Sequence, residues 1–289
     1  MKIAWMALFA GSLAIGSLSL CAADAAGGAE KTVAVKPLDG AAGFPGAVSD
    51  FKGFVRHDFE VDGCKAIVVE PKKALPGNPW IWRAEFFGAF PGVDLALLDK
   101  GFHVAFITVG NTFGSPDALK HWDVFYKEMT GKYGLSKKPA LEGLSRGGLY
   151  IYNWAAMNTG KVGCLFGDAA VCDFKSWPGG KGKGKGSKGD WAALQKCYHF
   201  ASEQEALDYK GNPVDNLKPI VDAKIPIIHI YGDADDVVPW DENTGVIKER
   251  VEKLGGSMTV IPKPGVKHHP HGLDDPAPVV DFIMAHAGR

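Results

Sequence analysis

The sequence has few cysteines and no excess of charge of either sign. Its 289 residues include five cysteines, none spaced as C-x-x-C, and 32 basic residues balance 33 acidic ones to a net charge of −1. The cysteine spacing argues against a zinc site built from thiolates. The charge balance gives no reason to expect nucleic acid or an anionic membrane surface as a partner. No internal repeat is evident, and a hydrophobic fraction of 46% supplies a large globular core.

The chain begins with the layout of a secretory signal peptide. Lys2 supplies a positive charge, Ile3–Leu20 is largely apolar, and Ala23-Asp24-Ala25 offers a cleavage site. We therefore expect a signal peptide at residues 1–25, a lead-in at residues 26–52, and a secreted or periplasmic product without stable membrane insertion. Two alternatives stay open. The apolar run approaches the length of about 20 residues that spans a bilayer, and the stretch ending at Cys21 resembles a lipobox.

Cleavage of the signal peptide would leave an even number of cysteines, namely Cys64, Cys164, Cys172 and Cys197. An oxidising compartment permits disulfides between such residues. We expect either one disulfide among the last three or four reduced thiols, and the sequence alone does not decide between them.

Segments with the patterns of strands and helices alternate from Gly53 to the end of the chain. Asp62-Gly63 is a hairpin turn signal between the first two strands. The expected strands cover residues 54–61, 64–69, 79–87, 102–109, 139–144, 162–166, 225–231 and 258–261. The main expected helices cover residues 115–132, 146–158, 242–254 and 278–286. This order predicts an α/β domain over residues 53–289, with a mostly parallel central sheet and helices on both faces.

The alternation breaks at residues 168–224, where we expect a short insertion over the carboxyl edge of the sheet, like a cap. The stretch Ser176–Trp191 alternates glycine with lysine and predicts a mobile surface loop that cannot pack. Short helical pieces are expected near residues 192–198, 203–209 and 214–223. Loops at this edge of a parallel sheet are where such folds build their sites.

The strongest local motif is Gly143-Leu144-Ser145-Arg146-Gly147, which matches G-x-S-x-G between an apolar strand and a helix. A serine on such a tight turn is strained and closely surrounded by backbone, which is why glycines flank it. The turn projects the hydroxyl above the edge of the sheet, and the following helix N-terminus favours developing negative charge. Ser145 is therefore the candidate nucleophile.

A serine hydroxyl needs a base to remove its proton and a carboxylate to orient that base. After a buried strand that ends at Tyr231, the stretch Gly232-Asp233-Ala234-Asp235-Asp236-Val237-Val238-Pro239 resembles the Gly-x-x-Asp-x-x-Val-Pro turn that carries the acid in many α/β-hydrolases. The resemblance covers most of residues 53–289 by strand and helix order. It implies an α/β-hydrolase fold with Asp235 as the acid, while Asp233 and Asp236 are alternatives.

The resemblance also implies a histidine on the loop before the last helix, and "GVKHHPHGLDDP" lies there. The similarity of "PKPGVKHH" to the Pro-Gly-x-x-His form of that loop selects His268, with His269 and His271 as alternatives. A metal site on the three histidines with Asp274 and Asp275 is another interpretation. Ligands crowded into one loop need a partner from a distant element, and none is evident in the sequence, so we expect no metal.

The oxyanion hole should use the backbone N–H of Arg146 and a second N–H after the strand "WIWRAEFF", at Ala84 or Glu85. Serine followed by arginine resembles the nucleophile turn of glucuronoyl esterases, although the rest of their motif is absent. The Arg146 side chain is expected either to hold a substrate carboxylate or to pair with Glu142 or Glu85. Arg83 is a further candidate for binding substrate.

Together these features predict a secreted serine hydrolase that cleaves small-molecule or carbohydrate esters through an acyl-enzyme, without a cofactor. Acyl or acetyl groups on carbohydrates are the expected substrates. The alternatives are a prolyl-peptidase-like serine peptidase and a binding protein that keeps the fold without turnover.

Overall fold

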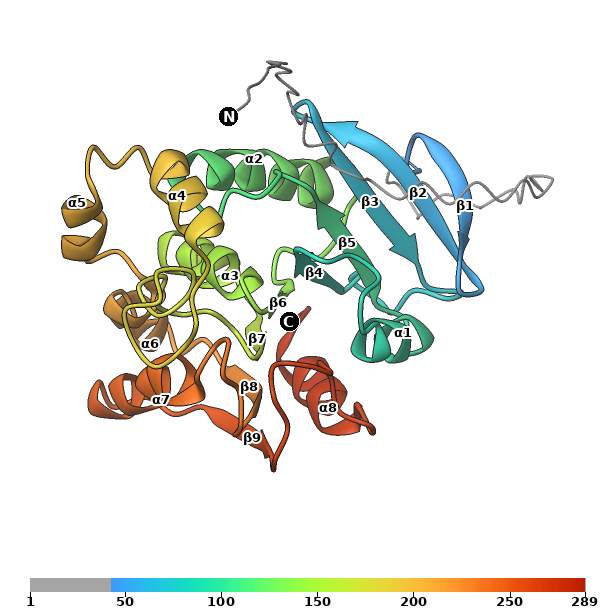
Figure 1. The fold of residues 1–289 in the computed structure, drawn as a ribbon. Coiled ribbons are helices and arrows are strands. Elements are labelled where there is room, and N and C mark those ends of the chain that lie inside the picture. Colours follow the sequence, from blue (N-terminus) through green and yellow to red (C-terminus); the bar gives the residue numbers. More distant parts are fainter. Residues whose placement is uncertain (1–42, 289) are drawn as a thin grey trace, which may run out of the picture. The chain divides into compact units, whose positions relative to one another are not determined.

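Nine strands form one sheet in the order β1-β2-β3-β5-β4-β6-β7-β8-β9 (Figure 1). Neighbouring strands from β1 to β5 in this order are antiparallel. Neighbouring strands from β5 to β9 are parallel. The strands are β1 (Ala47–Phe51), β2 (Phe54–Val61), β3 (Cys64–Glu70), β4 (Trp80–Ala84), β5 (His103–Ile107), β6 (Ala140–Leu144), β7 (Cys164–Asp168), β8 (Ile227–Gly232) and β9 (Thr259–Lys263). The predicted mostly parallel sheet with an opening hairpin is therefore confirmed.

The computed structural model describes residues 43–288, so the expected signal peptide and the start of the lead-in lie outside the described residues. β1 falls inside the predicted lead-in and pairs with β2 through Phe51 and Phe54. The sheet therefore begins before Gly53, where the predicted domain began. Within residues 43–288, no helix is both long enough and apolar enough to cross a membrane.

Helices cover both faces of the sheet (Figure 1). The α-helices are α1 (Gly92–Asp99), α2 (Pro116–Lys127), α3 (Gly147–Met157), α4 (Lys188–Cys197), α5 (Glu203–Asp208), α6 (Lys218–Asp222), α7 (Thr244–Lys253) and α8 (Ala277–His286). Short turns of other helix types are η1 (Glu128–Lys132), η2 (Thr159–Lys161), η3 (Pro213–Asp215) and η4 (Trp240–Glu242). α2 and α3 share one hydrophobic cluster with one face of the sheet, and α1 and α8 share another cluster with the opposite face.

The alternation of side chains along β4 shows why the sheet needs both helical layers. Trp82 stacks on Trp122 of α2 with ring centroids 4.2 Å apart, while Ile81 belongs to the cluster of α1 and α8. Successive residues of a strand point to opposite faces. An aromatic side chain buries roughly 150–250 Å², which is worth about 4–6 kcal/mol at 25 cal/mol per Å². The tryptophans of this region therefore serve the core rather than a ligand site.

The connection between β7 and β8 contains α4, α5, η3 and α6 and builds a third hydrophobic cluster. Phe174, Trp191 and Tyr198 are buried in this cluster together with Phe113 from the connection after β5. Ser187 begins α4 by accepting a hydrogen bond from the N–H of Asp190, as an N-terminal cap does. The insertion therefore packs through its own aromatic core.

Candidate active site

Ser145 lies on the turn between β6 and α3, in a backbone conformation that few residues other than glycine adopt. Its φ is +47°, in the left-handed region, which costs on the order of 1–3 kcal/mol for such a residue. A Cβ on Gly147 would lie 2.7 Å from the carbonyl oxygen of Ala84, and one on Gly143 would lie 2.7 Å from the backbone of Gly147. The two glycines of the motif are therefore required by close backbone approach, as the sequence predicted.

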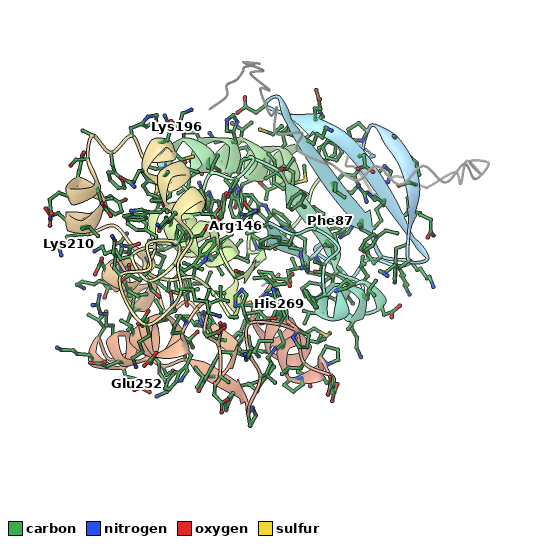
Figure 2. All side chains as sticks on the ribbon, in the orientation of Figure 1. Phe87, Arg146, Lys196, Lys210, Glu252 and His269 are labelled. Carbon is green, nitrogen blue, oxygen red and sulfur yellow. The ribbon has the colours of Figure 1, made fainter. Side chains whose placement is uncertain are left out.

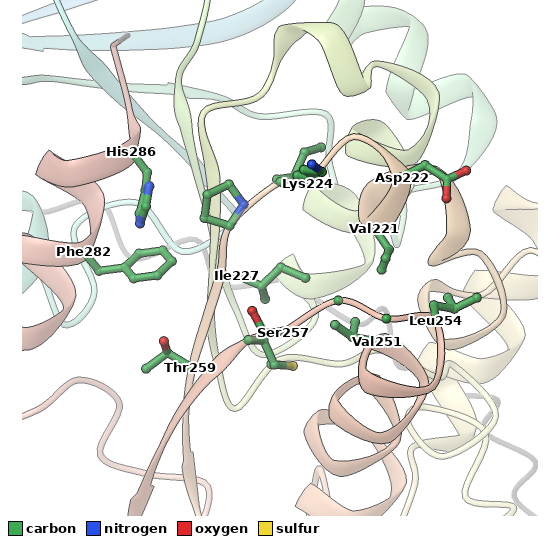
Figure 3. Close-up of a pocket in the computed structure, with 15 residues that line it drawn as sticks. Val221, Asp222, Lys224, Ile227, Val251, Leu254, Ser257, Thr259, Phe282 and His286 are labelled. Carbon is green, nitrogen blue, oxygen red and sulfur yellow. The ribbon is translucent and has the colours of Figure 1, made fainter.

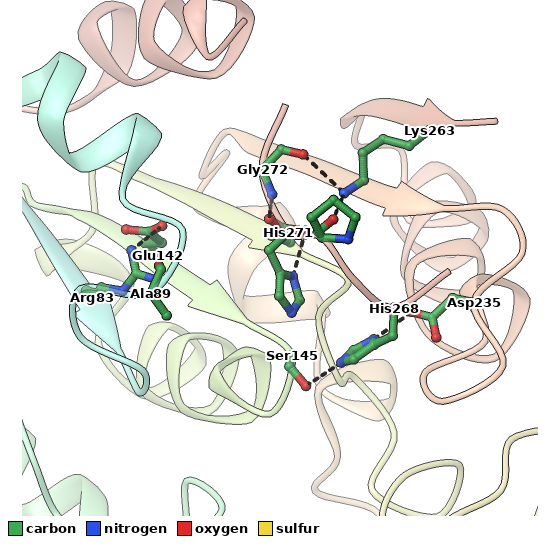
Figure 4. A network of polar contacts seen from close by, with 11 residues as sticks. Arg83, Ala89, Glu142, Ser145, Asp235, Lys263, His268, His271 and Gly272 are labelled. Atoms are coloured by element: carbon green, nitrogen blue, oxygen red, sulfur yellow. Dashed lines mark hydrogen bonds and ion pairs between the residues drawn. The ribbon is translucent and has the colours of Figure 1, made fainter. Parts of the chain in front are cut away.

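The loop after β9 brings His268 against Ser145 (Figure 4). The Nε2 atom of His268 is 3.0 Å from the Oγ atom of Ser145, and its Nδ1 atom is 2.7 Å from Oδ2 of Asp235. The other oxygen of Asp235 accepts hydrogen bonds from the N–H groups of Val237 and Val238, each at 2.9 Å. These bonds fix the carboxylate, which in turn fixes the imidazole with Nε2 directed at the serine.

The structure thus joins the three predicted residues into one hydrogen-bonded chain, and all three are buried. In this arrangement His268 can accept the proton of Ser145 when the hydroxyl attacks a carbonyl carbon, and Asp235 can stabilise the resulting imidazolium. Of the two alternative histidines, His269 is exposed and His271 is directed at Asp168.

Asp168, at the end of β7, connects the nucleophile turn to the histidine loop, and it was not among the residues predicted from the sequence. Its backbone carbonyl accepts the N–H of Ser145 at 2.9 Å, and its Oδ2 accepts the N–H of Gly272 at 2.6 Å. Oδ1 lies 3.1 Å from Nδ1 of His271, close enough for an ion pair but not aligned as a hydrogen bond. Its place at a carboxyl strand end beside β6 was the signal that could have identified it.

Two backbone N–H groups of the expected oxyanion hole have no hydrogen-bond acceptor in the part of the chain that the structure describes. Among residues 43–288, neither Arg146 nor Glu85 finds an acceptor for its backbone N–H. Ala84, the other candidate, is still part of the central strand β4, so its N–H is directed along the sheet. Glu85 leaves the strand with a φ of +63°. The geometry therefore favours Glu85 over Ala84 as the second donor.

The Arg146 side chain pairs with Glu85 rather than with Glu142. Its Nη2 lies 3.0 Å from Oε2 of Glu85, and its guanidinium lies 4.9 Å from the ring centre of Phe86. The side chain is still 22% exposed, so part of it stays accessible to solvent, next to the nucleophile in sequence. Figure 2 labels Arg146, which follows the nucleophile, and His269, which follows His268.

The expectation that Arg83 binds substrate is wrong, because its side chain is completely buried on the α1 face of the sheet. Its Nη1 donates to Asp94 at 2.6 Å and to Glu142 at 3.2 Å, and its Nη2 donates to the carbonyl of Ala89. Burial raises the pKa of Glu142 well above its ordinary range, although Arg83 opposes the shift. Arg83 therefore anchors the loop after β4 to the strand that carries Ser145.

Two exposed aromatic side chains contact neighbours of the triad residues and were also missed. Phe86 is 39% exposed and Phe90 is 41% exposed, although both are large and apolar. Phe90 stacks on His269 at 5.9 Å and, with His271, lines a shallow hollow of about 130 Å³. The Phe-rich stretch after β4, "EFFGAFPG", was the available signal.

The glycine–lysine stretch packs against the loop that carries Asp235, contrary to the expectation that it cannot pack. Lys185 pairs with Asp236 at 2.6 Å, and Lys183 pairs with Asp241. A Cβ on Gly184 would lie 2.9 Å from Pro239. The small residues let this backbone approach the acid loop closely, while the lysines neutralise its aspartates.

A separate hollow of about 830 Å³ lies at the amino ends of β8 and β9 (Figure 3). Ile227, Thr259, Phe282 and His286 contribute to its lining. Because the triad lies at the carboxyl ends of the same strands, this hollow is not part of the site.

All four cysteines of the described residues are free thiols, which resolves the alternative left open by the sequence. Cys164 and Cys172 are buried, and burial raises the pKa of both thiols far above the ordinary range. These two side chains are therefore inert core residues.

No family model and no curated protein matches the sequence. Solved structures do match. Dipeptidyl peptidase 4 of Porphyromonas gingivalis has a TM-score of 0.59 at 13% identity, over 81% of this chain and 35% of that one. Acylaminoacyl peptidase of Pyrococcus horikoshii gives 0.54 at 15% identity, over 74% and 37%. A puromycin-hydrolyzing peptidase of Mycobacterium tuberculosis gives 0.57 at 14% identity, over 80% and 38%. This chain therefore spans little more than a third of the length of these structures.

Proposed function

Since the chain has the α/β-hydrolase fold, as its acid turn implied, we propose that it is a serine hydrolase that cleaves carboxylic esters through an acyl-enzyme. The observation that carries the proposal is the continuous contact from Ser145 through His268 to Asp235, at 3.0 Å and 2.7 Å. A fold alone does not specify an activity. A strained serine aligned with an imidazole and a fixed carboxylate supplies the nucleophile, the base and its orienting group.

In the proposed reaction, Ser145 Oγ attacks the ester carbonyl carbon while its proton passes to Nε2 of His268. The backbone N–H groups of Arg146 and Glu85 stabilise the oxyanion of the tetrahedral intermediate. When the intermediate collapses, the bond to the alkoxide breaks and His268 returns the proton to that oxygen. Water then attacks the acyl-serine with His268 as base, which releases the acid and restores Ser145.

We propose carbohydrate esters, with acyl or acetyl groups, as the substrate class. Phe86 and Phe90 are exposed, and they contact Arg146 and His269, the neighbours of Ser145 and His268 in sequence. Exposed aromatic rings are surfaces on which sugar rings stack. The Arg146 side chain is also partly exposed. An ester on a large, polar alcohol suits a shallow site better than a buried one, because the alcohol can remain in water.

A serine peptidase is the second candidate, because the matching structures include a dipeptidyl peptidase and an acylaminoacyl peptidase. The same triad chemistry cleaves amides, with an amine as the leaving group in place of an alcohol. A non-catalytic binding protein is the third candidate, and labelling of Ser145 by a fluorophosphonate would exclude it.

The test compares the wild-type chain with Ser145→Ala on p-nitrophenyl acetate, acetylated xylo-oligosaccharides and glycyl-prolyl p-nitroanilide. We expect turnover of the two esters and loss of at least about 10³-fold in the variant. Ester turnover that survives the substitution would refute the triad. Turnover of the anilide without turnover of the esters would favour the peptidase.

The aromatic surface has its own test. Phe90→Leu removes the ring and keeps an apolar side chain, so it should raise KM for the sugar ester and leave p-nitrophenyl acetate turnover unchanged. Equal effects on both substrates would argue against sugar stacking.

We also propose export to the periplasm or the medium, which rests on Lys2, the apolar run and Ala23-Asp24-Ala25. Determination of the N-terminal residue of the mature protein tests this. A terminus shortly after Ala25 supports cleavage, and a lipid-modified Cys21 supports the lipoprotein alternative.

A further inference from the structure

The three histidines of the loop after β9 converge on one point. One nitrogen from each of His268, His269 and His271 lies within 4.8 Å of the corresponding nitrogens of the other two. The three rings pack edge to face, with centroids 4.9–5.0 Å apart and planes inclined by 68–82°. His268 and His271 are buried, and His269 closes the cluster on the solvent side.

Carboxylates from two other strand ends determine which nitrogens are free. Asp235, after β8, holds Nδ1 of His268 at 2.7 Å, and Asp168, at the end of β7, lies 3.1 Å from Nδ1 of His271. Carboxylates placed in this way on the rear nitrogen of an imidazole orient metal-binding histidines and strengthen their basicity. Because both carboxylates lie at Nδ1, Nε2 is the nitrogen of each ring that remains for a cation, and in His268 this atom contacts the Oγ atom of Ser145. Those carboxylates are the support from distant elements that the sequence did not reveal.

Asp274 and Asp275, the acidic residues that the sequence associated with the cluster, are both exposed on the following turn. The Lys263 Nζ atom, on β9, donates to the carbonyls of Pro270 at 2.6 Å and Gly272 at 3.1 Å, which fixes the loop from behind. The cluster is therefore a set of imidazoles on an anchored loop and not an acidic turn.

We propose that His268, His269 and His271 bind a zinc-class divalent cation, and that the bound ion switches off the triad by occupying Nε2 of His268. Three imidazoles with an open fourth position are a ligand set that Zn²⁺ accepts in tetrahedral geometry. Zn–N bonds of about 2.0–2.1 Å place two such nitrogens about 3.4 Å apart, so small side-chain rotations complete the site. Mg²⁺ and Ca²⁺ prefer oxygen ligands and should not bind.

A cation bound at Nε2 of His268 would block catalysis, because it occupies the lone pair of that nitrogen. The lone pair of Nε2 that would accept the proton of Ser145 is the same lone pair that would bind the cation. Ser145 Oγ is 3.0 Å from this nitrogen, so the hydroxyl loses its base when the ion binds. This inhibitory effect rests on the proposed function, whereas cation binding does not.

Binding is tested first, on the full chain stripped with EDTA. Zn²⁺ titration against a colorimetric chelator should show one site per chain, with no site for Mg²⁺. His269→Ala removes the exposed ring and should weaken Zn²⁺ binding at least about tenfold. Loss of a residue that only supports a metal ligand already lowers metal affinity by this factor. His199→Ala is the matched control, since His199 is a histidine on another surface whose side chain is 74% exposed. Equal Zn²⁺ affinity in the wild type and in His269→Ala would overturn the proposal, as would the absence of a site.

Inhibition is tested by the rate at which a fluorophosphonate labels Ser145. Saturating Zn²⁺ should slow labelling at least about tenfold, EDTA should restore it, and His269→Ala should require correspondingly more Zn²⁺. Labelling that is unaffected when the site is filled would refute the switch. Zn²⁺ binding that depends on His269 in a chain with no ester turnover would instead refute the proposed function alone. Ser145→Ala should keep the Zn²⁺ site, since the three imidazoles are unchanged.

Discussion

The backbone carbonyl of Asp168 accepts a hydrogen bond from the N–H of Ser145, while the carboxylate of the same aspartate holds the histidine loop at Gly272. One residue at a strand end thus fixes two parts of the triad relative to each other.

Replacing this aspartate should therefore affect both stability and reactivity. Asp168→Ala leaves the Gly272 N–H without its acceptor and removes the carboxylate beside His271, which should lower the free energy of unfolding by about 1–3 kcal/mol. It should also slow fluorophosphonate labelling of Ser145, because His268 sits on the loop that is released. Asp168→Asn keeps an acceptor of the same shape and should recover most of the stability in urea unfolding. Labelling of the alanine variant at the wild-type rate would contradict the role of Asp168 in positioning His268.

The acid of the triad can be tested by changing only its hydrogen-bonding pattern. In Asp235→Asn the amide oxygen can still accept from Val237 and Val238, so its NH₂ group faces Nδ1 of His268. This stabilises the tautomer with the proton on Nε2, which cannot accept from Ser145. Ester kcat should fall by about 10³–10⁴-fold with little change in stability. A loss below tenfold would mean that Asp235 does not set the tautomer.

The left-handed backbone conformation of Ser145 predicts that replacing the serine by glycine stabilises the protein although it abolishes activity. Ser145→Gly relieves a φ of +47°, whereas Ser145→Ala retains it. Both variants should be inactive, but the glycine variant should be more stable than the alanine variant by about 1 kcal/mol. Urea denaturation of the two inactive proteins measures this difference directly. Equal stability would indicate that the surrounding contacts impose no strain.

The two arginines of the region offer a comparison of buried and accessible ion pairs. Arg83→Met leaves Asp94 and Glu142 buried without their cation, which should cost about 3–5 kcal/mol of stability. Arg146→Met removes a pair with Glu85 that is partly in water, and its cost should be at most about 1 kcal/mol. Thermal unfolding of both variants distinguishes them. A small effect of Arg83→Met would mean that Glu142, whose pKa burial raises, is neutral in the folded chain.

Two buried histidines predict a loss of stability in acid. Burial lowers the pKa of His103 and of His229 from the ordinary value of 6.5 to about 4. Both imidazoles are neutral in the folded chain. Their contribution to the free energy of unfolding is therefore fully present above pH 6.5, and it is lost as the pH falls toward 4. Each should add a slope of about 1.4 kcal/mol per pH unit in that window. In urea unfolding between pH 7.5 and 4.5, His103→Leu should reduce the slope, and His286→Leu, at an exposed position, is the control.

Local motifs explain why much of the fold and the triad could be predicted from sequence. The nucleophile turn and the Asp62-Gly63 hairpin depend on residues close together in the chain. Strand order placed Asp235 at the correct edge. Arg83 was misplaced because it alternates with Trp82 and Ala84 along β4 and so faces α1, where its partner Asp94 lies. No pattern in the sequence indicated that Arg83 pairs with Asp94.

Other features depend on contacts that the sequence pattern does not encode. The choice among three histidines is made by Asp168 and Asp235, which hold different rings from different strands. The packing of the glycine–lysine stretch depends on the acid loop, to which Lys185 is bonded across 51 positions. β1 was missed because four of its five residues are exposed, so it lacks the alternation that marks a half-buried strand.

The distances along the chain within the triad bear on how the molecule folds. His268 contacts Asp235 across 33 positions and Ser145 across 123, and contacts of such long range form slowly. The nucleophile turn can form as soon as β6 and α3 exist, but its reactivity requires β8 and β9 to have joined the sheet beyond β7. The rate at which Ser145 becomes reactive during refolding therefore reports when β8 and β9 join the sheet. The reactivity of one oxygen atom thus measures a late step in folding.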